Sequence, residues 1–333
     1  MQLLRLFLSL GGGLALFLFG MNVLGESLRR RAGNRLEALL GKLTKGRLRG
    51  FLLGFGVTVA VQSSSAVTVM TVGFVNSGIM TLRQAVGVII GANVGTTVTA
   101  WILSTSALES TALWLEFLKP SFFTPILALL GIGLLLFSKK ESRQNTGNIL
   151  LGFAVLMFGM EAMSAAVKPI SEIEGIEKVF LFFSNPLIGI LTGAILTAVL
   201  QSSSASVGIL QALSVTGQLS FGAAIPIIMG QNVGTCVTGL ISSIGTTYHA
   251  KRVAVVHLYF NLFGTALLLT AFLLAKRFFV LPFLSESVRV VDIAVIHTLF
   301  NLACTIVFLP LAGLLERLAI RTVKAPTEES HDA

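Results

Sequence analysis

Long apolar stretches separated by short polar or basic segments make up most of the chain. Several of them approach or exceed the roughly 20 residues that a membrane-spanning helix needs. They lack the alternation of apolar and polar residues that marks the strands of a membrane barrel. The pattern therefore predicts an all-α polytopic membrane protein, with apolar helical segments at 6–24, 51–75, 81–102, 122–137, 148–167 and 221–241 and two further spans before residue 316.

Two copies of a Gln-Ser-Ser-Ser tetrapeptide interrupt these apolar stretches, at 62–65 and at 201–204. A second polar motif follows each copy, Gly-Ala-Asn-Val-Gly-Thr-Thr at 91–97 and Gly-Gln-Asn-Val-Gly-Thr-Cys at 230–236. Gln201 follows Gln62 by 139 positions, and Asn232 follows Asn93 by the same 139 positions. The chain therefore contains an ungapped internal duplication.

The polar motifs also predict how each repeat folds. Polar side chains in the middle of an apolar run that ends in a turn signal at 76–78 favour a re-entrant helical hairpin around the tetrapeptide. Glycines and hydroxylated, β-branched residues have poor helix propensity. We therefore expect a broken transmembrane helix at 81–102 and again at 221–241.

Charge decides the expected orientation of the two repeats. The linker at 25–50 is strongly basic, whereas the equivalent linker at 168–185 carries two lysines and three glutamates. Because lysine and arginine concentrate on the cytoplasmic side, this difference is typical of inverted-topology repeats. We divide the chain into a first repeat at 1–138, a second repeat core at 139–245, additional transmembrane helices at 246–315 and a polar, unstructured cytoplasmic tail at 316–333.

The two additional spans resemble each other. His257 and Asn261 recur as His297 and Asn301, 40 positions later. Residues four apart share one face of a helix. We favour hydrogen bonds between helices for these residues over contact with a ligand.

Composition narrows the function classes. The chain of 333 residues is 54% hydrophobic and 12% charged, which indicates a multi-pass protein of the cell or inner membrane with the lipid bilayer as its partner. The formal charge of +9 comes from basic residues in short segments between apolar runs, where lysine and arginine set the orientation in the membrane. Nucleic acid is therefore not an expected partner. The two cysteines and four histidines show no metal-ligand spacing, and we expect no cofactor.

The polar motifs supply oxygen atoms and hydrogen-bond donors but no charged side chain. A half-helix that begins at the serines offers free N–H groups and the positive end of a dipole, which suits an oxyanion. Hydroxyl, amide and freed carbonyl oxygens suit a hard monovalent cation equally well. Neither motif contains Lys, Arg, Asp or Glu, so co-bound cations are the expected counter-charge for an anion. The motifs therefore indicate symport.

Two other functions compete with transport as explanations of the polar motifs. Small residues permit close packing of helices, so the alternative is a membrane packing or scaffold module whose polar centres only join helices. A serine nucleophile needs a nearby base, and neither motif contains His, Asp or Lys. An enzyme is therefore not expected.

Paired Gln-Ser-Ser-Ser segments, each followed by Gly-x-Asn-Val-Gly-Thr, resemble the type II sodium–phosphate cotransporter family over residues 15–310. The resemblance implies symport of inorganic phosphate with sodium as the coupling ion, both bound between the two hairpins near the membrane midplane. By motif position it implies sodium sites at Gln201, Ser202, Thr235 and Thr238 and, by symmetry, Gln62, Ser63, Thr96 and Thr99, and a phosphate site at Ser64, Ser65, Ser203, Ser204, Asn93 and Asn232. Cys236 stands where the first repeat has Thr97, which leaves the sodium stoichiometry open.

The inverted topology predicts the outcome of a labelling experiment. In a variant without the native cysteines, single cysteines placed at Arg35 and at Glu174 should react with an impermeant thiol reagent from opposite sides of the membrane. The reason is that the two linkers hold equivalent positions in oppositely oriented repeats. Labelling of both positions from one side would contradict the inverted repeat.

Overall fold

The computed structural model describes residues 2–43, 46–107, 120–173 and 175–325. Six helices within these ranges are long and apolar enough to cross a membrane. The prediction of an all-α polytopic membrane protein is therefore confirmed. Glu174 and the end of the polar tail at 326–333 lie outside the described residues, and the division of the chain into four segments stays a prediction.

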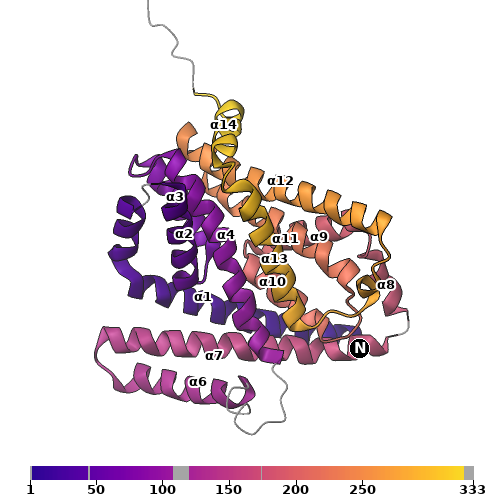
Figure 1. Ribbon diagram of the computed structural model, residues 1–333. Coiled ribbons are helices and arrows are strands. Elements are labelled where there is room, and N and C mark those ends of the chain that lie inside the picture. The colour runs from indigo at the N-terminus through magenta and orange to yellow at the C-terminus, as the bar shows by residue number, and fades with distance from the viewer. Residues whose placement is uncertain (1, 44–45, 108–119, 174, 326–333) are drawn as a thin grey trace, which may run out of the picture.

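Figure 1 shows the helices of the described residues, labelled in chain order. In chain order they are α1 (Gln2–Leu43), α2 (Arg47–Val61), α3 (Ser64–Asn76), α4 (Leu82–Ser104), η1 (Thr105–Ala107), α6 (Pro120–Phe137), α7 (Glu141–Val167), η2 (Lys168–Glu172), α8 (Ile176–Phe182), α9 (Pro186–Leu200), α10 (Ser203–Ser214), α11 (Phe221–Ser242), α12 (Tyr248–Phe278), η3 (Pro282–Ser285), α13 (Val290–Phe308) and α14 (Ala312–Thr322). Helix α6 matches the expected segment at 122–137, but its apolar part is shorter than a typical span.

Helices α4 and α11 form the centre of the bundle, because 83% and 67% of their most apolar windows are buried, against 17% for α1 and 22% for α12. Each has a close neighbour from its own repeat, α2 beside α4 and α9 beside α11. The second polar motif of each repeat therefore lies in the most enclosed part of the protein.

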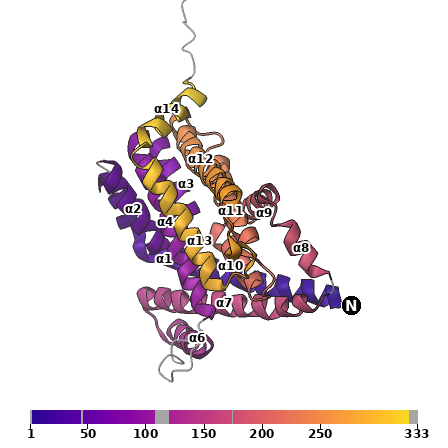
Figure 2. The ribbon, with the colours of Figure 1, turned by 45° about the vertical axis from the view of Figure 1, so that its right-hand side comes forward.

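Helices α1 and α7 pack along each other, with α6 on another side of α7 (Figures 1 and 2). A Cβ at Gly13 would stand 2.7 Å from the Met163 nitrogen, and one at Gly152 would stand 2.7 Å from the Leu24 nitrogen. Low residue numbers of α1 thus meet high numbers of α7, so the two helices run antiparallel. The two contacts are also equivalent, since Gly152 follows Gly13, and Met163 follows Leu24, by 139 positions.

The prediction of broken helices at 81–102 and 221–241 is wrong. Both α4 and α11 are continuous across the Asn-Val-Gly-Thr motif. A Cβ at Gly91 would stand 2.0 Å from the Phe51 carbonyl oxygen of α2, and one at Gly230 would stand 1.9 Å from the Ile190 carbonyl oxygen of α9. The glycines therefore permit backbone contact between helices, and the threonine hydroxyls bond to carbonyl oxygens one turn earlier in their own helix.

The chain breaks instead at the two tetrapeptides. Helix α2 ends at Gln62 and α3 begins at Ser64, while α9 ends at Gln201 and α10 begins at Ser203. These four helices have 15, 13, 15 and 12 residues. None of them reaches the length of roughly 20 residues that a single span needs.

Helices extend into two segments outside the predicted spans, the basic linker at 25–50 and the tail at 316–333 that we expected to be unstructured. The basic linker at 25–50 continues α1 as far as Leu43, and the polar tail expected from Glu316 begins inside α14. Helix α14 is amphipathic and buries Leu315 and Ala319, while Arg317 and Arg321 are exposed on its surface. An unbroken helical period with apolar residues on one face explains both differences.

Close contact at Gly91 and Gly230 predicts a large effect of adding one methyl group. We expect Gly91→Ala and Gly230→Ala each to lower the free energy of unfolding by on the order of 1–3 kcal/mol, because the added carbon overlaps backbone atoms of the neighbouring helix. Gly56→Ala is the matched control, since a Cβ there meets nothing within 4 Å. Unfolding in detergent measures all three, and equal stability of the three variants would contradict the contact.

Candidate functional site

Each tetrapeptide joins the end of one helix to the start of the next. Gln62 and Gln201 adopt left-handed backbone conformations, with φ of 55° and 52°, at the C-termini of α2 and α9. The following Ser63 and Ser202 are N-caps, and each hydroxyl accepts a hydrogen bond at 3.2 Å from an amide three residues later. Positive φ is uncommon for residues other than glycine, and its recurrence in both repeats marks these junctions as functional candidates.

The two junctions face one cavity of about 360 Å³. The hydroxyl of Ser65 lies 3.4 Å from the carbonyl oxygen of Gln201, which links the two repeats directly. The cavity is lined by both tetrapeptides together with α1 and the end of α9, namely Leu18, Met21, Asn22, Gly25, Arg29, Gln62, Ser63, Ser64, Ser65, Leu200, Gln201, Ser202, Ser203 and Ser204. Eight expected site residues from the two tetrapeptides therefore meet in one place.

The start of α3 and the start of α10 both lie at this cavity. The first amide N–H groups of a helix have no acceptor within the helix, and the helix dipole is positive at that end. The side chains of Ser64, Ser203 and Ser204 are buried around this point and add hydroxyl donors. The arrangement can bind an oxyanion through backbone and hydroxyl donors from both repeats.

The expected sodium ligands on α4 and α11 lie beside the cavity rather than in its wall. The hydroxyl of Thr99 donates to the side-chain oxygen of Gln62 at 3.0 Å, and the hydroxyl of Thr238 lies 3.5 Å from the carbonyl oxygen of Gln201. Thr99 and Gln62 also line a second cavity of about 260 Å³. Each repeat thus has a Gln–Thr pair at the equivalent position.

Thr96 and Thr235, the other two threonines of the expected sodium sites, are buried in α4 and α11. Their hydroxyls donate to the carbonyl oxygens of Ala92 and Gln231 at 3.1 and 2.9 Å. Neither lines the cavity between the tetrapeptides. Each hydroxyl oxygen keeps lone pairs, so both residues retain the ability to coordinate a cation.

The two asparagines expected to bind phosphate lie away from the cavity wall. The side-chain oxygen of Asn93 accepts from Asn261 of α12 at 3.3 Å, and that of Asn232 accepts from Asn301 of α13 at 3.1 Å. All four side chains are buried. The expected interhelical hydrogen bonds are therefore confirmed for Asn261 and Asn301, and the offset of 40 positions gives each repeat its own partner helix. They are not found for His257 and His297, whose Nδ1 atoms are buried without a hydrogen-bond partner in the described part of the chain.

Five residues of α1 line the cavity and were not among the expected site residues, and two of them, Asn22 and Arg29, have polar side chains. The absence of a basic residue from both tetrapeptides suggested a site without a fixed positive charge. The fold supplies one from a different helix. The three arginines of 29–31 did stand out in the sequence, but a cluster of basic residues beside an apolar run is normally a topology signal.

Comparisons with known proteins point to one family. A sequence profile described as Na+/Pi-cotransporter matches residues 16–165 and 171–285. The Bacillus subtilis protein YqeW, described as uncharacterized, is 31% identical over 304 residues, across 91% of this chain and 93% of its own length. No solved structure matches the chain at a significant level.

Two further relatives carry functional names. The putative inorganic phosphate export protein YjbB of Salmonella typhimurium is 25% identical over 331 residues, which are 96% of this chain and 56% of YjbB. The human sodium-dependent phosphate transport protein 2B is 39% identical over 92 residues, which are 26% of this chain and 13% of the human protein. The chain thus spans little more than half of YjbB and matches only a short part of the human protein.

The hydrogen bonds from Asn261 to Asn93 and from Asn301 to Asn232, here called the asparagine bridges, predict coupled losses of stability. Asn301→Leu leaves the buried oxygen of Asn232 without its donor, so we expect the free energy of unfolding to fall by about 1–3 kcal/mol. Adding Asn232→Leu should cost less in the Asn301→Leu background than alone, because the bridge is already lost. Additive losses in a double-mutant cycle measured by unfolding in detergent would contradict the bridge.

Proposed function

Because this chain belongs to the Na+/Pi-cotransporter family, we propose that it carries inorganic phosphate across the cell membrane in symport with sodium. The single observation that carries the proposal is the cavity in which the two serine tetrapeptides meet. A transporter site between equivalent parts of two repeats can be reached from either side by a modest rearrangement. Phosphate is proposed to bind there at Ser64, Ser65, Ser203 and Ser204.

The donors of the cavity support an anion as the transported species. Amide N–H groups at the starts of α3 and α10 and the serine hydroxyls can all donate to phosphate oxygens. No acidic residue lines the cavity within the part of the chain that the structure describes. Asn93 and Asn232 are left out of the proposed phosphate contacts because their amides already bond within the bundle.

The Gln–Thr pairs support sodium as the coupling ion. Gln62 with Thr99 and Gln201 with Thr238 place side-chain and backbone oxygens beside the anion cavity in both repeats. Hard cations such as sodium prefer oxygen ligands of this kind. We propose that Ser63 and Thr96 complete the first sodium site and that Ser202 and Thr235 complete the second.

An inverted arrangement of the two repeats is part of the proposal. Support comes from α1 and α7, which are equivalent in the duplication, run antiparallel and contact each other through equivalent residues. A two-fold axis between the helices would relate them in this way. The short helices α2, α3, α9 and α10 support re-entrant hairpins, since none is long enough to span alone.

Phosphate export is the second candidate function. YjbB, which is similar along 96% of this chain, is named as a putative inorganic phosphate export protein. The same cavity serves either direction, because ion gradients and not the binding site decide the net flux. A packing or scaffold role is less compatible with the geometry, since small residues that only join helices would not line a cavity of about 360 Å³.

Purified protein in proteoliposomes tests the proposal. We expect uptake of radiolabelled phosphate to rise when sodium is higher outside than inside and to fall when potassium replaces it. The double variant Ser64→Ala and Ser203→Ala should raise the KM for phosphate, because two hydroxyl donors leave the cavity. Ser77→Ala is the control, since Ser77 is exposed at the far end of α3.

Different results would overturn different parts of the proposal. Phosphate transport that does not respond to the sodium gradient in either direction would remove the symport. A complete absence of phosphate flux in folded protein would remove phosphate as the substrate. Equal KM values in the double variant and in Ser77→Ala would move the phosphate site away from the serines.

A further inference from the structure

Three consecutive arginines of α1 have three different surroundings. Arg30 forms an ion pair with Glu26, one turn earlier in the same helix. Arg31 donates to the hydroxyl of Thr146 on α7 at 2.9 Å. Arg29 lines the cavity between the serine tetrapeptides. The three charges are therefore not interchangeable, although they are neighbours in the sequence.

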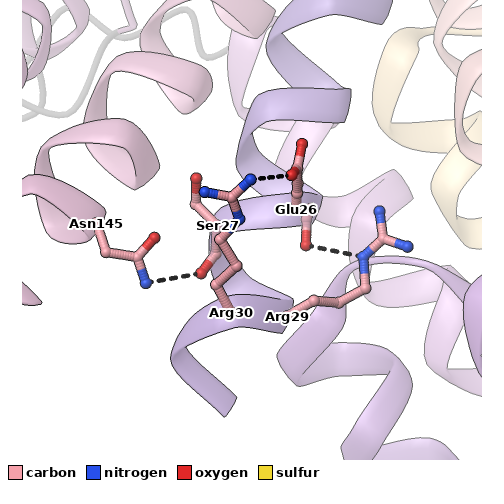
Figure 3. A network of polar contacts seen from close by, with 6 residues as sticks. Glu26, Ser27, Arg29, Arg30 and Asn145 are labelled. Atoms are coloured by element: carbon pink, nitrogen blue, oxygen red, sulfur yellow. Dashed lines mark hydrogen bonds and ion pairs between the residues drawn. The ribbon is translucent and has the colours of Figure 1, made fainter. Parts of the chain in front are cut away.

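The guanidinium of Arg29 keeps most of its donors free. Its Nε donates to the carbonyl oxygen of Gly25 at 3.3 Å, and its two terminal nitrogens have no hydrogen bond or ion pair within the described residues. Figure 3 shows Arg29 on one side of the Glu26–Arg30 pair and Asn145 on the other, where Asn145 donates to the Ser27 carbonyl oxygen. Glu26 thus forms its ion pair with Arg30, and no ion pair joins Glu26 to Arg29 among the described residues.

We propose that Arg29 is a binding residue for the transported anion and supplies the positive charge that the serine tetrapeptides lack. The inference rests on the proposed function, since it concerns the same cavity. A guanidinium presents two parallel N–H groups to a tetrahedral oxyanion, whereas serine hydroxyls and amides contribute dipoles only. Arg29 thereby selects a charged oxyanion over neutral solutes of similar size.

A fixed charge in the cavity changes the role of sodium. If sodium ions alone balanced the negative charge of phosphate, phosphate would bind weakly whenever the sodium sites were empty. With Arg29 present, one positive charge remains in the cavity whatever the sodium concentration. Arg29 therefore lets phosphate bind at low sodium, and removing it makes phosphate affinity depend more steeply on sodium.

The charge also comes from one half of the protein only. The position of the second repeat that is equivalent to Arg29 is Lys168, the first residue of η2, and neither Lys168 nor any residue of α7 lines the cavity. The serines are contributed symmetrically by both repeats, but the guanidinium is contributed by α1 alone. The anion is therefore held closer to α1 than to α7.

The test compares Arg29→Gln with Arg31→Gln, which removes one arginine from the same helix but outside the cavity. We expect Arg29→Gln to raise the KM for phosphate about tenfold or more, because a hydrogen-bonded charged partner of the anion is lost. The rise should be larger at low sodium than at saturating sodium. Arg31→Gln should leave the KM and its sodium dependence close to those of the unmodified protein.

Arg29→Lys adds a readout that a purely structural role would not change. Lysine retains the charge but not the planar pair of donors, so this variant should recover part of the affinity. Raising the ionic strength with choline chloride should weaken phosphate binding in the unmodified protein more than in Arg29→Gln, since the cavity is open to solvent and its charge is screened. Equal salt dependence in both proteins would overturn the inference.

The outcome separates this inference from the proposed function. If the unmodified protein transports phosphate and Arg29→Gln behaves like Arg31→Gln, phosphate transport stands and the role of Arg29 falls. If the unmodified protein transports sulfate but no phosphate, and Arg29→Gln loses that activity, the role of Arg29 stands and the proposed substrate falls. Measuring both anions in every variant therefore distinguishes the two.

Discussion

Unpaired backbone groups in the middle of an apolar bundle are the constraint on which this structure depends. A lipid bilayer offers no hydrogen-bond partners, so irregular backbone at membrane depth is tolerated only where it is enclosed in protein or lines a polar cavity. The junctions at Gln62 and Gln201 create such groups twice, in equivalent positions. Because both junctions open into one cavity, the backbone groups of both repeats that have no partner within a helix face the same polar space.

The remaining packing places these junctions opposite each other. The glycines of α4 and α11 bring α2 and α9 into backbone contact with the centre of the bundle, and each of these helices ends at a junction. Helices α12 and α13 then fix the central helices through buried asparagine pairs. Side chains larger than glycine at those contacts would displace α2 and α9, and with them the serines.

The duplication made much of the fold predictable from the sequence. The helical class follows from the apolar runs, and the break at each tetrapeptide follows from its polar residues within such a run, whereas the meeting of the two copies was expected from the family resemblance. The continuity of α4 and α11 could not be predicted, because propensity opposes a helix at Gly91 and Gly95 and only the contact with α2 explains them. Arg29 was missed for a similar reason, since nothing in the spacing along the chain reveals that α1 reaches the cavity.

The asparagine bridges set an order for biogenesis. Asn93 and its partner Asn261 are 168 positions apart, so the amide oxygen of Asn93 has no partner from α12 while the second repeat is still being synthesised. For Asn232 the delay between synthesis of the residue and synthesis of its partner is much shorter, because Asn301 follows it by only 69 positions. The half of the protein that leaves the ribosome first is therefore completed late. In a nascent chain that stops before α12, the amide oxygen of Asn93 on α4 lacks the donor that it has in the finished protein and faces lipid or the insertion machinery.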